Sequence, residues 1–179
     1  MKKGTIITGT ILLLAATAAQ AQDDMRYTTG ISDLYRANEF SIEGFGLGTV
    51  NQYTINHPSG DRVRHNGRLG AGAGLSYFFT KYIGVEGEAM TQNTAHNFVD
   101  QSGGSLVLRF PIGNTGLAPY VFGGGGHLFD PRPGSYGHAG GGLEFRFMPN
   151  FGIFADGRYV WTDRIGNYGE GRAGIRIAF

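Results

Sequence analysis

The sequence contains no cysteine. Disulfide bonds therefore take no part in the fold, and no thiolate is present to act as a nucleophile or a metal ligand. Lysine is almost as scarce, because Lys81 is the only lysine after Lys2 and Lys3. The other basic residues are arginines, which are better suited to ion pairs held away from bulk water. Charged residues make up 16% of the chain, which is less than a soluble surface normally carries.

Long hydrophobic runs are also missing, with one short exception at the start. Residues 6–18 form an apolar run that follows Lys2 and Lys3 and precedes Ala19-Gln20-Ala21. A positive start, a short apolar centre and an A-x-A site are typical of a secretory signal peptide, and the run is too short for a stable spanning helix. We therefore expect residues 1–21 to be removed on export, with a retained N-terminal anchor as the alternative.

The charge balance changes once residues 1–21 are set aside. The full chain has 15 Lys+Arg and 14 Asp+Glu, so losing Lys2 and Lys3 leaves 15 − 2 = 13 basic and 14 acidic residues, a net charge of −1. A nucleic-acid partner therefore has no electrostatic support. The remaining 179 − 21 = 158 residues are enough for one domain.

Strict alternation of apolar with polar or small residues is abundant in the sequence. In the last segment Ala173, Ile175, Ile177 and Phe179 share one face of a strand. The opposite face carries Arg172, Gly174, Arg176 and Ala178. Similar alternation recurs along the chain and predicts strands over residues 39–49, 68–79, 82–92, 104–112, 118–128, 136–148, 151–163 and 168–179. Each has about the 9–11 residues that a tilted transmembrane strand needs. We therefore predict an all-β fold, an eight-stranded antiparallel up-and-down transmembrane β-barrel over residues 39–179.

The connections between these segments alternate in length. Short turns are expected at residues 80–81, 111–117 and 148–150, and longer polar loops at 50–67, 93–103, 129–135 and 164–167. Three short periplasmic turns and four long outer loops are the arrangement of bacterial outer-membrane barrels. Residues 22–38 do not alternate, and Ser32 is a candidate N-cap for a short helix over residues 33–36. We expect this segment to be a mobile periplasmic lead-in or a short plug.

Charged residues fall on the strand face opposite the aliphatic residues. These are five acids and five arginines that we expect to pair inside the barrel as a lumen ion network: Glu43, Glu86, Glu88, Arg109, Glu144, Arg146, Asp156, Arg158, Arg172 and Arg176. An eight-stranded barrel is just wide enough for side chains to fill. The sequence therefore predicts a plugged polar interior without a wide pore. Many of the 32 glycines supply small positions there or permit strands to bend.

Aromatic residues gather near the expected strand ends, which predicts two girdles at the membrane interfaces. The periplasmic girdle would contain Tyr77, Phe79, Tyr82, Phe147, Phe151 and Phe179. The outer girdle would contain Tyr53, Tyr136, Tyr159 and Trp161. The alternative is the ordinary preference of strands for aromatic residues.

One histidine pair is a candidate for chemistry. A hairpin centred between Arg132 and Pro133 would make His127 and His138 cross-strand neighbours in the lumen, with Asp130 nearby. Such a group could bind a divalent metal or act as a base with a carboxylate. The alternative is that these histidines are simply polar residues at the opening of the barrel and have no specific role, and we adopt this alternative. Residues 169–174 match G-x-G-x-x-G but lack the following helix that a dinucleotide site needs. We therefore predict no catalytic residue, no metal and no cofactor.

Several segments resemble a known family. The chain end Ile175-Arg176-Ile177-Ala178-Phe179 resembles the terminal signal read by the outer-membrane assembly machinery, with Ile175, Ile177 and Phe179 at its alternate positions. Residues 119–125 and 140–145 are similar to strands of the small outer-membrane β-barrel family, of the OmpA-like transmembrane domain and OmpX/Ail type. The resemblance covers about residues 39–179. It implies a Gram-negative-type outer membrane and passage through the periplasm with chaperones.

The sequence also departs from that family in two ways. No peptidoglycan-binding domain follows Phe179, so we expect the cell-wall tether of full-length OmpA-like proteins to be absent. No His-Ser run resembles the lipid A deacylases of this barrel class, which weakens an enzymatic interpretation.

We accordingly expect a non-enzymatic protein of the cell outer membrane with a structural or surface-interaction role of the adhesin kind. Its expected partners are outer-membrane lipids, the assembly machinery and periplasmic chaperones, and we expect a monomer. The loops at 50–67 and 93–103 would carry recognition. The alternatives are a narrow channel for ions or small solutes, an outer-membrane enzyme acting on lipid or peptide, and a soluble lipocalin-like barrel.

Overall fold

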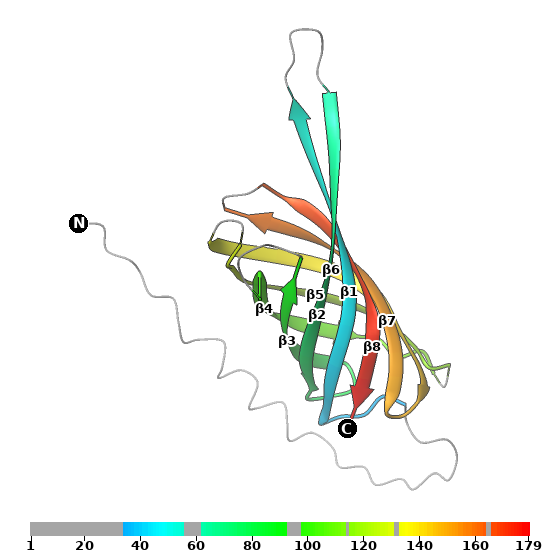
Figure 1. Ribbon diagram of the computed structural model, residues 1–179. Helices are drawn as coiled ribbons and strands as arrows, with labels where there is room; N and C mark the ends of the chain where they lie inside the picture. Colours follow the sequence, from blue (N-terminus) through cyan, green and yellow to red (C-terminus); the bar gives the residue numbers. More distant parts are fainter. Residues whose placement is uncertain (1–33, 56–61, 93–97, 114, 131–132, 164–165) are drawn as a thin grey trace, which may run out of the picture. The chain divides into compact units, whose positions relative to one another are not determined.

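The protein is an eight-stranded antiparallel barrel, as seen in a computed structural model (Figure 1). The structure describes residues 34–55, 62–92, 98–113, 115–130, 133–163 and 166–179, with backbone only for 51–55 and 62–66. The strands are β1 (Glu39–Ile55), β2 (Arg62–Phe78), β3 (Ile83–Thr91), β4 (Gln101–Arg109), β5 (Leu117–Leu128), β6 (Gly134–Met148), β7 (Phe151–Thr162) and β8 (Tyr168–Ala178). Each pairs with its neighbour in sequence, and β8 closes onto β1. The predicted fold class is confirmed.

The barrel has two distinct ends. At the turn end the connections are residues 79–82, 110–116 and 149–150, and the chain's last residue lies here, with the Phe179 amide donating to the Phe40 carbonyl at 2.8 Å. At the loop end the strands are joined across 56–61, 92–100, 129–133 and 163–167. The predicted signal peptide at 1–21 and most of the lead-in lie outside the described residues. No described helix is long and apolar enough to cross a membrane.

The first hairpin differs from the sequence prediction. Residues 50–67 were expected to form a loop, but β1 and β2 stay paired as far as Ile55 and Arg62. β8 leaves β1 at Val50, and β3 leaves β2 at Ala71. Residues 51–66, which we call the free hairpin, therefore have strand segments that pair only with each other, and Figure 1 shows β1 and β2 running past the other strands. The prediction failed because polar residues were taken to mean a loop, whereas strand segments that pair only with each other can also carry polar residues.

Smaller differences occur elsewhere. β4 begins at Gln101 and ends at Arg109, which is three residues earlier at each end than expected. Residues 34–38 form bends instead of the end of a short helix.

Glycine allows the strands to approach one another closely on the inner side. A Cβ atom on Gly124 would lie 1.9 Å from the Gly104 carbonyl oxygen, and one on Gly174 would lie 2.2 Å from that of Gly44. A side chain at these positions would collide with neighbouring backbone, so the tight curvature depends on glycine there. Outward glycines such as Gly44 and Gly169 have open space around them.

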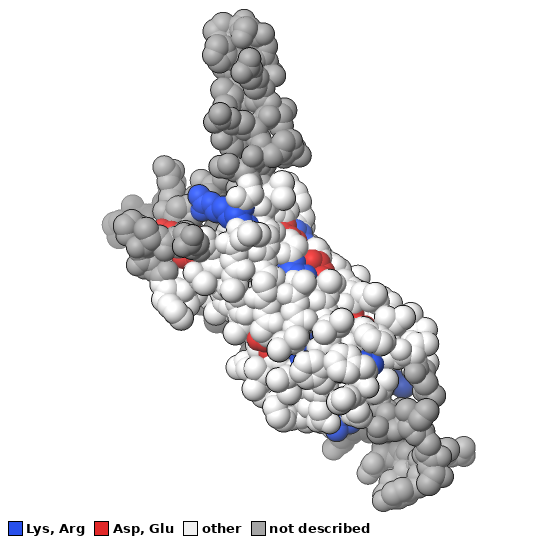
Figure 2. All heavy atoms as spheres, turned by 45° about the vertical axis from the view of Figure 1, so that its right-hand side comes forward, with Lys and Arg blue, Asp and Glu red and all other residues white. Residues whose placement is uncertain are grey.

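The two faces of the wall have opposite chemistry. Every outward strand position with a described side chain lacks Asp, Glu, Lys and Arg, and many carry large apolar residues such as Leu75, Leu106 and Ile153. Figure 2 accordingly shows a largely uncharged outer wall. Inside, charged residues share the lumen with apolar side chains that include Phe45, Phe122 and Phe154. This is a protein with its charge inside and its apolar surface outside.

Candidate functional site: the charged lumen, its two ends and the outer wall

The turn-end layer of the lumen contains two arginines and two glutamates. Arg146 binds Glu39 through two nitrogens at 2.6 and 2.7 Å, and its Nε donates to Glu144 at 2.6 Å. Arg109 lies 3.1 Å from Glu39 and 3.5 Å from Glu144. All four side chains are fully buried. Paired, hydrogen-bonded geometry of this kind is what a buried charge requires.

The middle of the lumen continues the same alternation. Arg176 binds Glu144 on one side and Glu43 at 2.9 Å on the other, and its Nη2 lies 3.9 Å from Glu86. Glu43 also accepts a bond from Ser76 at 2.8 Å. Arg176 therefore joins the turn-end layer to the next.

The loop-end half completes the chain of charges. Arg172 holds Asp156 with two bonds of 2.9 Å and also binds Glu86 and Glu88. Arg158 binds Glu88 and lies 2.6 Å from Glu170. Acid and guanidinium thus alternate without a break from Glu39 to Glu170, an array that we call the ion ladder.

Aromatic rings lie against guanidinium groups of the ion ladder. Arg172 lies 5.1 Å from the ring centre of Phe45 and 5.2 Å from that of Phe122. Arg109 lies 3.7 Å from the ring centre of Phe78. Such contacts attract the cation to the ring face and are stronger where water is excluded.

The structure brings all ten residues proposed for the lumen network together in this ladder. Sequence reasoning missed two further acids, Glu39 and Glu170, so seven carboxylates face five guanidinium groups. The signal was present, because Glu39 has the strand parity of Glu43, and Glu170 has that of Arg172. Their positions at strand ends hid them.

A tyrosine from outside the sheet closes the turn end. Tyr35 is 5% exposed, and its hydroxyl donates to the Gly116 carbonyl at 2.7 Å. Burial, together with the nearby Glu144 carboxylate, raises the pKa of Tyr35 above its usual value. The phenol therefore stays a neutral donor at physiological pH.

The loop end is closed mainly by apolar side chains. Leu128, Tyr136, Val160 and Tyr168 form a buried cluster. Tyr168 donates to Gln101 at 3.0 Å. Tyr136 was expected in the outer girdle, but it occupies an even position of β6 and points inward, where it is 6% exposed. Trp161 and Tyr159 do lie on the outer wall, with ring centres 5.2 Å apart.

The proposed histidine pair does not exist. β5 and β6 pair His127 with Ser135 and His138 with Gly124, so the hairpin centre lies near residue 131. His127 consequently faces outward beside Phe129, with ring centres 5.1 Å apart. His138 is buried, and its Nε2 lies 2.7 Å from the Ser105 hydroxyl. Among the described residues no group of three or more His, Asp and Glu side chains is placed to hold a metal.

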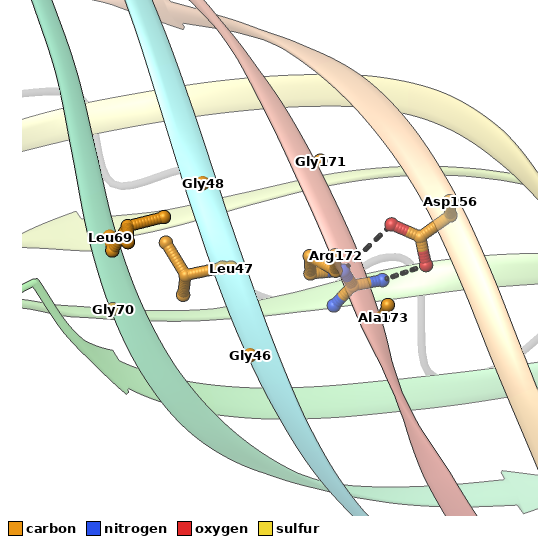
Figure 3. Close-up of a pocket in the computed structure, with 9 residues that line it drawn as sticks. All are labelled: Gly46, Leu47, Gly48, Leu69, Gly70, Asp156, Gly171, Arg172 and Ala173. Atoms are coloured by element: carbon orange, nitrogen blue, oxygen red, sulfur yellow. Dashed lines mark hydrogen bonds and ion pairs between the residues drawn. The ribbon is translucent and has the colours of Figure 1, made fainter.

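A groove of about 470 Å³ lies on the outer wall. It lies over β2, β1 and β8, where the outward positions are Gly46, Gly48, Gly171 and Ala173, with Leu69 at one side (Figure 3). Behind it the figure shows Arg172 bonded to Asp156. Small residues, and not a ring of polar groups, make this groove.

Known structures share this architecture. The N-terminal β-barrel domain of Pseudomonas aeruginosa OprF matches with a TM-score of 0.59 and 18% identity, over 80% of this chain and 99% of that one. Yersinia pestis Ail, the attachment invasion locus protein, matches with a TM-score of 0.54 and 22% identity over 80% and 99%. The P. aeruginosa outer membrane protein OprG matches with a TM-score of 0.52 and 14% identity over 81% and 97%. The chain has the fold of the small outer-membrane barrels.

This fold agrees with the resemblance drawn from the sequence. No protein-family model and no curated protein sequence matches the chain. At these identities the likeness establishes the fold alone, and the role must be argued from the residues.

Proposed function

We propose that the protein is an integral outer-membrane barrel with a closed interior and a non-catalytic, structural or surface-interaction role. The observation that carries this is the outward face of the strands, which is uncharged wherever its side chains are described, set against an ion ladder buried inside. Lipid is the solvent that such an outer face requires. The exposed large apolar residues would otherwise form one continuous patch far beyond what a soluble monomer tolerates.

The single tryptophan tests this directly. Trp161 is 47% exposed on the outer wall near the loop end. In vesicles of brominated lipid its fluorescence should be quenched, most strongly by bromine near the headgroups. A second variant, Ala155→Trp in a Trp161→Phe background, places the probe nearer the middle of β7 and should be quenched best by deeper bromine. A soluble lipocalin-like barrel would leave both proteins unquenched.

The free hairpin is the element best suited to surface interaction. It extends past the points where β8 and β3 stop pairing, so it is not needed to close the barrel. The sequence from residue 50 to 68 contains Arg62, Arg64 and Arg68 against the single acid Asp61. We infer that it contacts an anionic partner. The Ail barrel has been crystallised with the heparin analogue sucrose octasulfate, which suggests an anionic saccharide as the probe.

Binding to sulfated dextran, with neutral dextran as the reference, tests this role. Replacing Arg62, Arg64 and Arg68 with glutamine should abolish retention, and added salt should weaken it in the parent protein. Arg36→Gln with Lys81→Gln removes charge at the turn end, where both side chains are exposed, and should change nothing. An equal loss of dextran binding in the hairpin variant and in the turn-end variant would mean that overall charge determines the binding, and would count against the free hairpin as the binding element.

A channel and an enzyme are the other roles that the sequence left open. The ion ladder and the closed ends argue against a channel. The Ser105–His138 contact is a nucleophile-and-base pair in form, but both side chains are buried and no acid is bonded to His138 among the described contacts. A labelled fluorophosphonate should therefore leave Ser105 unmodified.

A further inference from the structure

The segment before β1 enters the barrel at the turn end. The Tyr35 ring contacts two guanidinium groups, because the guanidinium carbons of Arg109 and Arg146 each lie 4.6 Å from its centre. Besides its bond to Gly116, the hydroxyl lies 3.4 Å from the Glu144 carbonyl. A ring that contacts two cations in a buried site gains from both contacts.

The backbone on either side of Tyr35 is also held. Arg146 donates to the Leu34 carbonyl at 2.8 Å, and the Arg36 amide donates to Glu39 at 3.4 Å. Asn38 has a φ of 54°, which turns the chain into β1, and its side chain accepts a bond from Tyr77 at 3.3 Å. Residues 34–38 are therefore fastened to the barrel without joining its sheet.

The site that receives Tyr35 is built from distant parts of the sequence. Gly116 lies 81 residues from Tyr35, and Glu144 lies 109 residues away. Arg109 comes from the end of β4, Gly116 from the turn before β5, and Arg146 from the end of β6. These groups come together only when the strands are paired around the barrel.

Gly116 is shaped for this contact. Its φ is 73°, and a Cβ atom there would lie 2.2 Å from the Arg146 carbonyl oxygen. The Gly116 carbonyl accepts both the Tyr35 hydroxyl and the Arg146 amide, the latter at 2.8 Å. The same glycine thus fixes the end of β6 and receives the tyrosine.

We propose that residues 34–38 form a strap that closes the turn end of the lumen, with Tyr35 as its latch. The strap docks after the barrel has closed and shields the turn-end layer of the ion ladder from water. It can open while the barrel stays folded, because side-chain contacts rather than sheet hydrogen bonds hold it. This goes beyond the proposed function, since a closed membrane barrel does not in itself require a separate closing element.

Limited trypsin digestion of the folded protein in detergent micelles tests the strap. The Arg36 side chain is exposed, but a protease needs several residues in an extended form, so cleavage after Arg36 requires the strap to open. Cleavage after Lys81, in the exposed turn at the same end, is the internal reference. In the parent protein the ratio of Arg36 to Lys81 cleavage should be low.

The Tyr35→Ala variant should raise that ratio at least about tenfold, which corresponds to about 1.4 kcal/mol in the opening equilibrium. Tyr35→Phe keeps the ring contacts with the arginines but loses the Gly116 bond, so it should give an intermediate ratio. Tyr82→Ala removes an exposed tyrosine at the same end and should leave the ratio unchanged.

Two results would overturn the proposal. Rapid Arg36 cleavage in the parent protein would mean that the strap is not latched. A parallel rise at Arg36 and Lys81 in Tyr35→Ala and Tyr35→Phe would mean that the tyrosine stabilises the whole barrel and is not a separate latch. Trp161 quenching should be the same in all these variants, so failure of the strap is distinguishable from failure of the membrane assignment.

Discussion

At the scale of single residues, the interior depends on arginine. Each of Arg146, Arg172 and Arg176 bonds two or more acids in different directions. A planar group with five donors can do this, whereas a lysine ammonium has three donors on a flexible stem. The near absence of lysine beyond Lys3 is explained by this requirement and by the uncharged outer wall.

Removing one arginine of the ion ladder should be severe. In Arg176→Ala, Glu43 loses its arginine partner and Glu144 loses one of its three, inside a sealed lumen. We expect a loss of about 3–5 kcal/mol in the free energy of unfolding, because an uncompensated buried charge remains. Urea unfolding in lipid vesicles measures it. Arg36→Ala, which removes an exposed guanidinium, should unfold like the parent protein.

Two glycines in one turn allow a matched comparison. Gly113 and Gly116 both have positive φ, at 49° and 73°, but only Gly116 lacks room for a Cβ atom. Gly113→Ala should cost about 1–2 kcal/mol from the backbone conformation alone. Gly116→Ala should cost clearly more and should also release the strap, which the Arg36 cleavage ratio detects. Equal effects would show that the Arg146 carbonyl shifts aside easily.

At the scale of the strand, glycine has two separate roles. Gly124 faces inward against the Gly104 carbonyl, while its neighbour Gly123 faces outward with its nearest contact at 3.6 Å. Gly124 is needed for the strands to curve around a narrow lumen. Gly123 only leaves the outer surface without a protruding side chain at that position.

Alanine substitution should separate these roles on β5. Gly124→Ala should sharply reduce the fraction of protein that reaches the heat-modifiable folded form on gels, because the new methyl group overlaps backbone. Gly123→Ala should fold with the parent yield. If both fold equally well, the narrow lumen tolerates more relaxation than the close contact implies.

The free hairpin should be dispensable for folding. Replacing residues 51–66 with a two-residue Asn-Gly turn leaves every pairing of β1 with β8 and of β2 with β3 in place. We expect the parent yield of folded barrel and the parent unfolding midpoint in urea, together with the loss of sulfated dextran binding. A fall in folding yield would show that the hairpin helps the first strands to pair.

The same scale explains what the sequence could and could not predict. Alternation is local, so it assigned residues such as Arg172 and Glu86 to the inner face, and the pattern of short and long connections predicted the up-and-down order. Register depends on how two strands meet, and a pairing of His127 with Ser135 in place of His138 is enough to separate the two histidines. A short plug before the first strand was one of two expectations for this segment, but the role of Tyr35 could not be predicted because the residues that hold its hydroxyl lie more than 80 positions away.

At the scale of the whole molecule, the lumen is closed at both ends and filled between them. Tyr35 lies at one end and the Leu128–Tyr168 cluster at the other, with the ion ladder between. In planar bilayers we therefore expect no stable open channel from the parent protein or from Tyr35→Ala, since the apolar cluster remains. A steady conductance in the parent protein would contradict the closed interior and favour the channel.

The last strand supports a further prediction, on the assembly of the barrel. Phe179 is 61% exposed, and its ring centre lies 6.3 Å from that of Phe40. We propose that Ile175, Ile177 and Phe179 are read during assembly. Deleting Phe179 should reduce the amount assembled in cells several-fold, while spontaneous refolding into detergent changes little. Equal losses in both settings would mean that the residue acts through packing alone.

The ion ladder has a consequence before the barrel exists. Each strand needs charged or small residues on its inner face. The alternating strands therefore contain no uninterrupted apolar stretch of about 20 residues, which is the length that a membrane-spanning helix requires. The residues that neutralise one another in the folded interior thus also interrupt every long apolar stretch of the unfolded chain. The chain therefore combines a modest average hydropathy in the unfolded state with an apolar outer wall in the folded barrel.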